Sequence, residues 1–180
     1  MSESSGEQVP DKSEPNSYEI VPLGEGGKRT GFTCGDEALD SYFRTQVGQD
    51  GDRRLNVCFV AVHVESKQIA GFYTLSPCSV AVDLLPEELA RRLPQRPVGC
   101  TLMGRLAVAS AHQGQGLGGA LLFHAFQLAK KNELGGYALV VDAKHEKASA
   151  FYKQFGFISC PTEPLKLFLS LRKELQPASK

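Results

Sequence analysis

The stretch "SAHQGQGLGGALLFHAF", residues 110–126, places four glycines within six positions, directly ahead of an apolar run with helical spacing. The segment before it, "TLMGRLAV" at residues 101–108, has the character of a strand. Glycines in the first turn of a helix cost roughly 0.5–1 kcal/mol each relative to alanine. Several of them together indicate that something approaches the backbone closely at this point.

Three interpretations of the glycines compete. In the first, they make a flexible turn and allow close packing of the helix on the sheet. In the second, Gly114, Gly116 and Gly119 are the G-x-G-x-x-G of a dinucleotide-binding oxidoreductase, and Asp142 is its ribose-binding acid. That fold places its first glycine almost directly after the strand, whereas "ASAHQ" separates Val108 from Gly114. The chain after Asp142 is also too short for the second half of a doubly wound sheet.

In the third interpretation, the backbone amides from Gln113 to Gly118 surround a diphosphate at the N-terminus of the helix. A helix N-terminus offers unpaired N–H donors and about half a positive charge, and glycines let an anion come close. The loop lacks the G-K-[ST] of a P-loop, so hydrolysis of a triphosphate is not indicated. A diphosphate carrier held by backbone contacts fits the residues better.

The rest of the chain alternates strands and helices. We expect disordered tails at residues 1–16 and 176–180 and a single domain over residues 17–175. Hydrophobic spacing predicts strands at residues 18–23, 56–64, 68–82, 101–108, 137–143 and 165–171, and helices at residues 30–47, 85–93, 117–134 and 146–155. This order predicts an α/β fold with three layers and a mixed sheet.

Several local signals refine these boundaries. Thr33 precedes Asp36 by three residues, as in a capping box, and "GQDGDRR" at residues 48–54 indicates a loop. Gly135 and Gly136 are expected to end the long helix. Its predicted buried face consists of Leu117, Leu121, Leu122, Ala125, Leu128 and Ala129.

Composition limits the classes of function. The formal net charge is zero, so no overall field attracts nucleic acid or an anionic membrane. No apolar stretch is long enough to span a membrane, and "MSESSGEQVPDKSEPNS" has no signal-peptide core. The five cysteines are odd in number and lack C-x-x-C spacing, which favours reduced thiols in the cytoplasm and no metal site.

Two motifs together resemble the GNAT superfamily of N-acyltransferases. Gln113, Gly116 and Gly118 match its acyl-CoA-binding pattern Q/R-x-x-G-x-G/A. The segment "VVDAKHEKASAFYKQFGF", residues 140–157, is similar to its second signature, a strand and a helix that ends in F-Y-x-x-x-G-F. The two motifs have the order and separation of the superfamily, and the resemblance covers about residues 18 to 172.

The resemblance implies a site for acetyl-CoA, which acylates an amine. Leu106, Ala107 and Val108 would lie along the pantetheine arm on a central strand splayed from its neighbour. The pyrophosphate would be held by Gln113, Gly114, Gln115, Gly116, Leu117 and Gly118. Tyr152 would be the general acid, because a phenol with a pKa near about 10 can protonate a thiolate whose conjugate acid has a pKa near about 8.5. Without the resemblance, a buried aromatic with a satisfied hydroxyl is the simpler interpretation of Tyr152.

A general base remains unassigned. Asp142, His145 and Glu146 follow the strand, but a carboxylate that caps the next helix explains Asp142 or Glu146 equally well. His145 has a suitable intrinsic pKa, although a lone loop histidine is more often only solvated.

The segments "FTCGDEALDSYF" and "GRLAV" resemble the subgroup of tRNA-acetylating toxins of bacterial toxin–antitoxin pairs. That subgroup implies an aminoacyl-tRNA acceptor, a ribbon-helix-helix antitoxin partner and a homodimer. An RNA acceptor needs a basic surface, and folding would have to bring together Arg44, Arg53, Arg54, Arg91, Arg92, Arg96 and Arg105. A small amine or a protein N-terminus as the acceptor, and a non-catalytic acyl-CoA-binding module, remain alternatives.

Overall fold

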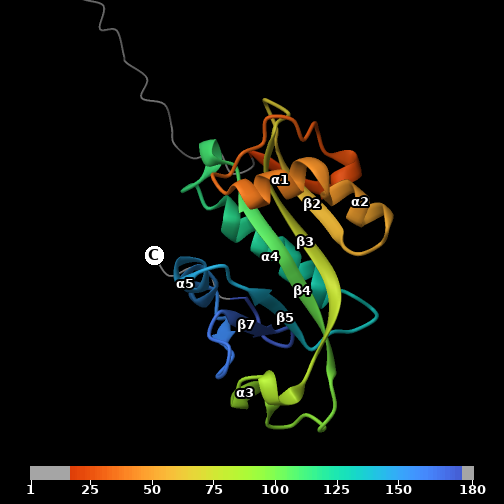
Figure 1. Ribbon diagram of the computed structural model, residues 1–180, viewed down its shortest axis with the longest axis vertical. Coiled ribbons are helices and arrows are strands. Elements are labelled where there is room, and N and C mark those ends of the chain that lie inside the picture. Colours follow the sequence, from red (N-terminus) through yellow and green to blue (C-terminus); the bar gives the residue numbers. More distant parts are fainter. Residues whose placement is uncertain (1–16, 176–180) are drawn as a thin grey trace, which may run out of the picture.

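The computed structural model describes residues 17–175, so the tails predicted for residues 1–16 and 176–180 lie outside the described residues. Figure 1 shows a central twisted sheet with helices on both of its faces. The sheet has seven strands in the order β1-β2-β3-β4-β5-β7-β6. The predicted α/β fold with a mixed sheet is therefore confirmed.

The strands are β1 (Tyr18–Pro22), β2 (Val57–His63), β3 (Ile69–Val80), β4 (Val98–Val108), β5 (Ala138–Asp142), β6 (Ile158–Ser159) and β7 (Lys166–Ser170). The α-helices are α1 (Glu37–Thr45), α2 (Val47–Asp52), α3 (Glu87–Ala90), α4 (Leu117–Lys130) and α5 (Glu146–Gln154). Short 3₁₀ helices are η1 (Leu23–Glu25), η2 (Val82–Leu84) and η3 (Ser110–His112).

The central strands β4 and β5 form the one parallel pair of this sheet, and every other neighbouring pair is antiparallel. They pair only where Thr101–Met103 meets Leu139–Val141, although β4 continues to Val108. Beyond Met103 the two strands diverge, which confirms the splayed pair. The antiparallel β7 beside β5 excludes the doubly wound parallel sheet of a dinucleotide-binding fold.

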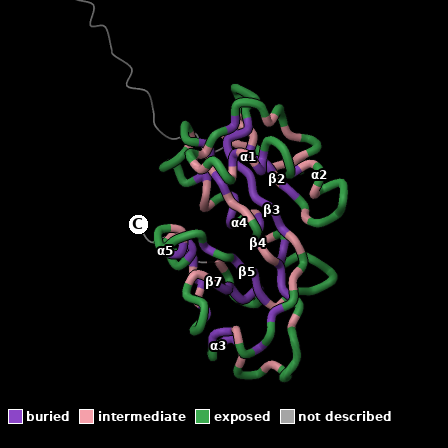
Figure 2. Tube along the Cα trace, viewed as in Figure 1, coloured by how far each residue is buried: buried purple, intermediate pink, exposed green. Residues whose placement is uncertain are grey.

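Helices cover both faces because side chains alternate along each strand. On one face, Phe43 of α1 stacks on Phe72 of β3, and α3 packs over β5. On the other face, α4 and α5 share a core with β3, β4, β5 and β7. Figure 2 shows buried residues running along the middle strands. The layers are thus helix, sheet and helix, as predicted.

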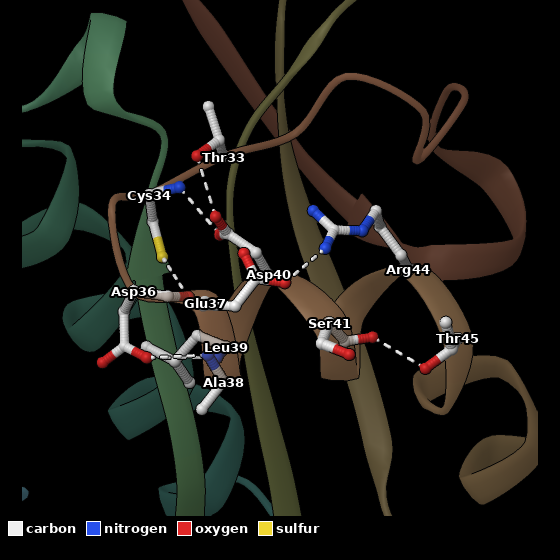
Figure 3. A network of polar contacts seen from close by, with 10 residues as sticks. All are labelled: Thr33, Cys34, Asp36, Glu37, Ala38, Leu39, Asp40, Ser41, Arg44 and Thr45. Atoms are coloured by element: carbon white, nitrogen blue, oxygen red, sulfur yellow. Dashed lines mark hydrogen bonds and ion pairs between the residues drawn. The ribbon is translucent and has the colours of Figure 1, made fainter.

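The start of α1 differs from the predicted capping box. Asp36 is the N-cap residue, and its carboxylate accepts hydrogen bonds from the backbone N–H groups of Ala38 and Leu39 (Figure 3). The Thr33 hydroxyl donates instead to Asp40 at 2.8 Å. An aspartate immediately before the helix is the better placed acceptor, because its short side chain reaches the first free N–H groups.

Several predicted boundaries were wrong: the helix predicted at residues 30–47 begins only at Glu37, and the strand predicted at residues 101–108 begins at Val98. The predicted loop at residues 48–54 is largely the helix α2, which the Tyr42 hydroxyl stabilises by donating to Asp50 at 2.9 Å. The helix α4 ends at Lys130 rather than near the glycine pair, because the Asn132 side chain accepts the Leu134 N–H and forms a turn. At α2 and at the end of α4, side-chain hydrogen bonds decide the local structure more than the presence of glycine does.

The buried face of α4 was also partly wrong. Leu128 is 36% exposed, whereas Phe126, which the prediction omitted, is fully buried. The short strand β6 was missed, because its two residues carry no periodic signal.

Candidate acyl-CoA site

The loop between β4 and α4 presents a row of free backbone donors. Within residues 17–175, the N–H groups of residues 113–119 donate to no protein acceptor. The first bond of the helix runs from Ala120 N–H to Gly116 O at 3.1 Å. Seven successive unpaired amides at a helix N-terminus are donors of the kind that bind an anion such as a diphosphate.

The four glycines have two different roles. Gly114 and Gly116 have φ values of +74° and +82°, which L side chains rarely adopt, and a Cβ on either would meet no atom within 4 Å. A Cβ on Gly119 would instead lie 3.0 Å from Cζ of Phe155. The first pair shapes the loop and leaves room beside it, while Gly119 allows α4 to approach α5. The packing interpretation is therefore confirmed for Gly119, while the ligand interpretation of Gly114 and Gly116 stays a prediction.

The Gln113 side chain fixes the loop. Its Nε2 donates to the carbonyl oxygens of Val108 and Cys34, both at 2.9 Å. The Gln115 side chain is also engaged, since its Oε1 accepts the Tyr18 hydroxyl at 3.1 Å. Neither glutamine side chain is free, and the loop offers main-chain donors to a ligand.

Tyr18 is a loop contact that sequence reasoning missed. Its hydroxyl lies 2.9 Å from Nδ1 of His112 in addition to its bond with Gln115. A hydroxyl donates only one proton, so when Tyr18 donates to Gln115, Nδ1 of His112 is the donor to the Tyr18 oxygen. No short-range signal could have linked β1 to a loop more than ninety residues away.

The free edge of β4 exposes alternate backbone groups. Ala109 N–H donates to Ala70 O at 2.8 Å, and Val108 lies opposite Gly71 in the antiparallel register. By alternation, the backbone groups of Ala107 face β3, and those of Leu106 and Val108 face the gap beside β5. Ala107 is buried under α1, so its side chain does not reach the gap.

Tyr152 projects from α5 into the core shared with α4. It is 9% exposed and lies edge-on to Phe151, with ring centroids 5.2 Å apart. Burial raises the pKa of Tyr152 to about 12, above the ordinary phenol value on which the sequence argument relied. Within residues 17–175 the Tyr152 hydroxyl has no protein hydrogen-bond partner, and it is not among the fully buried polar atoms without a partner, so its oxygen keeps some exposure to solvent.

The three candidate bases differ in their surroundings. Asp142 pairs with Lys166 at 2.6 Å. Nδ1 of His145 accepts the Ala148 N–H at 3.2 Å, so the imidazole caps α5, and the expectation of a carboxylate cap was wrong. Glu146 is exposed in the first turn. Residues 17–175 contain no group of three His, Cys, Asp or Glu side chains placed to bind a metal ion.

The candidate RNA-binding arginines do not form one surface. Arg44 pairs with Glu37 at 2.9 Å, and the Arg105 guanidinium lies 3.4 Å from the centre of the Tyr42 ring. Arg53 and Arg54 follow α2, whereas Arg92 and Arg96 follow α3. Figure 1 places α2 and α3 toward opposite ends of the molecule. Folding therefore divides the basic residues.

A splayed strand pair and a loop of free amides are features of an acyl-CoA-dependent transferase, and Tyr152 lies in the core that α4 and α5 share with the sheet. Residues 14–157 match the model of the Acetyltransferase (GNAT) family, and the chain belongs to this family. It is an N-acetyltransferase, and acetyl-CoA is its acyl donor. Among the helices of residues 17–175, none combines the length and apolar character required to cross a membrane.

Two curated relatives match most of the chain. A "tRNA-acetylating toxin" of Mycobacterium tuberculosis is 36% identical over 145 residues, which cover 79% of this chain and 86% of the relative. A "Probable toxin TacT" of Sinorhizobium fredii is 24% identical over 153 residues, with coverage of 79% and 84%.

Two solved structures are also similar to most of this chain. A tyrosine-to-phenylalanine mutant of KacT superposes with a TM-score of 0.81 at 27% identity, covering 87% of this chain and 96% of KacT. AtaT complexed with acetyl-methionyl-tRNAfMet has a TM-score of 0.80 at 26% identity, with coverage of 86% and 95%.

Proposed function

We propose that this enzyme acetylates the α-amine of an aminoacyl-tRNA and so blocks translation, as a toxin does. The observation that carries the proposal is the 36% identity to a tRNA-acetylating toxin over 79% of the chain. The structural similarity to AtaT, solved with acetyl-methionyl-tRNAfMet, supports the same acceptor. Acylation of the α-amine removes the nucleophile needed for peptide-bond formation.

In this proposal the diphosphate of acetyl-CoA is held by the backbone amides of Gln113, Gly114, Gln115, Gly116, Leu117 and Gly118. The free row of N–H groups and the open space at Gly114 and Gly116 support this assignment. The backbone groups of Leu106 and the N–H of Val108 bind the pantetheine arm as an added strand would, while the Val108 carbonyl oxygen accepts Gln113 Nε2. Ala107 contributes by fixing their register, because its own groups face β3.

Tyr152 is the proposed acid. The amine nitrogen bonds to the carbonyl carbon, the carbon–sulfur bond breaks with its electron pair on sulfur, and Tyr152 donates its proton to that sulfur. The proton lost by the amine returns to the phenolate through water. A pKa of about 12 keeps the phenol protonated before the reaction. The tyrosine-to-phenylalanine mutants made in KacT and AtaT direct attention to the same residue type.

The partners follow from the same relatives. AtaT has been solved with the C-terminus of the antitoxin AtaR, and KacTA with DNA. We infer a cytoplasmic enzyme that forms a homodimer and is neutralised by a ribbon-helix-helix antitoxin.

A second acceptor class is favoured by two observations. The net charge is zero and the candidate arginines are divided between two ends of the molecule, which suits a small amine or a protein N-terminus. Incubation with labelled acetyl-CoA and bulk charged tRNA, beside a panel of polyamines and peptides, separates the two classes. Label on the aminoacyl group supports the proposal. Label found only on polyamines or peptides would show that the acceptor belongs to the second class. Label on none of the substrates would favour a non-catalytic module.

A further inference from the structure

Residues Thr33, Cys34, Gly35 and Asp36, here called the strap, precede α1 and are held in a fixed shape. Asp40, which is 3% exposed, accepts the Thr33 hydroxyl and the Cys34 N–H, both at 2.8 Å (Figure 3). The Asp36 carboxylate adds the cap of α1 through its Oδ1. A strap anchored by a buried carboxylate cannot move without breaking these bonds.

The strap is joined to the end of β4 by two hydrogen bonds. Thr33 O accepts the Ser110 N–H at 2.9 Å, and Cys34 O accepts Gln113 Nε2 at 2.9 Å. Both partners lie in the segment that leads from β4 into the row of free amides. The strap therefore has a rigid connection to one side of the gap.

One ion pair joins the strap to the other side. Nζ of Lys144 lies 2.5 Å from Oδ2 of Asp36, and Lys144 stands two residues after β5 ends. Within residues 17–175, no other hydrogen bond or ion pair connects the strap to the loop between β5 and α5. The strap thus crosses the gap at its wide end, where β4 and β5 have diverged. A single side-chain contact, the Asp36–Lys144 ion pair, joins it to the β5 side.

We propose that Asp36 and Lys144 are positioning residues whose ion pair holds the β5–α5 loop against the strap and retains acetyl-CoA in the gap. The proposal rests on the proposed role of the amide row. Neither side chain contacts the reacting atoms in this proposal. The pair closes the wide end on the α1 face, so loss of the pair speeds release of the carrier and leaves the chemical step unchanged.

A purely electrostatic effect makes a different prediction. Acetyl-CoA is an anion, so removal of the Lys144 charge weakens its binding and removal of the Asp36 charge strengthens it. A connection across the gap makes both removals weaken binding, because either one breaks the same contact. The sign of the Asp36 effect therefore separates the two explanations.

The test uses the full chain and measures the dissociation constant and the release rate of acetyl-CoA. Asp36→Asn keeps an oxygen that can cap α1, and Lys144→Met keeps the length of the side chain. We expect each variant to raise the Kd about fivefold through faster release, with kcat at saturating acetyl-CoA unchanged. Lys130→Met is the matched control, because it removes a similarly short ion pair with Glu174 on another surface and is expected to have no effect.

The double variant supplies the decisive comparison. Asp36→Asn with Lys144→Met is expected to match either single variant, whereas independent effects would multiply to about 25-fold. Tighter binding by Asp36→Asn, or multiplicative effects, would overturn the proposal. If Asp36→Asn fails to fold, Lys144→Met is compared with Lys144→Arg, because arginine can restore the ion pair. An equal loss of acetyl-CoA affinity in both variants would overturn the proposal. If the wild-type chain binds no acetyl-CoA, the proposed function fails first.

Discussion

The side-chain amide of Gln113 bridges the carbonyl oxygens of Val108 and Cys34, at 2.9 Å from each. This one group connects the last residue of β4 to the strap before α1. It holds the following loop in place while every amide of residues 113–119 stays free of protein acceptors within the described chain. A loop ordered in this way loses little further entropy when it binds an anion.

Replacement of Gln113 is expected to weaken acetyl-CoA binding. Gln113→Glu cannot donate to either carbonyl and places a carboxylate beside two oxygens, so we expect the Kd for acetyl-CoA to rise about tenfold or more. Isothermal titration with acetyl-CoA measures the effect. Gln115→Ala is the control, since the Gln115 contacts are longer, at 3.1 and 3.4 Å, and a smaller loss is expected there. A larger loss in the control would contradict this role of Gln113.

Alanine at two glycines is expected to separate binding from stability. Gly116→Ala forces an L residue to a φ of +82°, which costs about 1–2 kcal/mol, and places a methyl group in the space beside the amides. We expect at least about a tenfold weaker affinity for CoA. Gly119→Ala instead pushes on Phe155 and is expected to lower the melting temperature with a smaller effect on affinity. Thermal melts and CoA titrations of both variants test this prediction. A larger loss of affinity in Gly119→Ala than in Gly116→Ala would contradict it.

Removal of the Tyr152 hydroxyl is expected to slow the chemical step. Tyr152→Phe keeps the buried ring, so the Kd for acetyl-CoA stays near the wild-type value while kcat falls about a hundredfold or more. A buried phenol with a pKa of about 12 remains protonated through pH 10, so the wild-type rate is expected to show no decline from Tyr152 ionisation below that pH. Steady-state rates across the alkaline range, at saturating acetyl-CoA, test both statements. Equal turnover by the two proteins would remove Tyr152 from the mechanism.

Acid is expected to destabilise the chain through Asp40. Burial raises the pKa of this carboxyl, but hydrogen bonds from Cys34 and Thr33 outweigh it and the net pKa lies below the ordinary value. A carboxyl with a lowered folded-state pKa stabilises the protein above its unfolded-state pKa of about 3.9, and this contribution is lost as the pH falls through the folded-state pKa.

Urea unfolding at a series of pH values measures this effect. Asp40→Asn is expected to lower the free energy of unfolding by about 1–3 kcal/mol at neutral pH and to flatten its decline in acid. Glu174→Gln, at an exposed surface pair, is expected to keep the wild-type pH dependence. An unchanged slope in Asp40→Asn would show that the acid sensitivity has another origin.

Local pattern was sufficient for most of the fold. The apolar runs that became β3, β5 and β7, and the spacing that became α5, are strong signals because burial selects them directly. Prediction failed where a distant partner decides the local structure. The helix α2 contains two glycines and depends on Tyr42, and the cap of α5 is His145 although two carboxylates lie nearby.

In the candidate site, too, the sequence predicted the local features but not the contacts between distant segments. The motif predicted a ligand contact for the backbone amide of Gln113, but it gave no sign that the side chain donates to Val108 and Cys34. The phenol pKa assumed for Tyr152 was too low, because the burial that raises it comes from several elements. Tyr18 and Lys144 carried no signal at all, since each meets its partner across about a hundred residues of chain.

The sequence by itself determined the order of strands and helices, the glycine loop at the N-terminus of α4 and the family to which the chain belongs, because hydrophobic period and backbone freedom are local properties. Only the tertiary structure decided which amides stay unpaired, which backbone groups on the edge of β4 point into the gap, and how the strap reaches Lys144. Those features depend on strand register and on contacts between distant segments, and the packing of the whole sheet sets both.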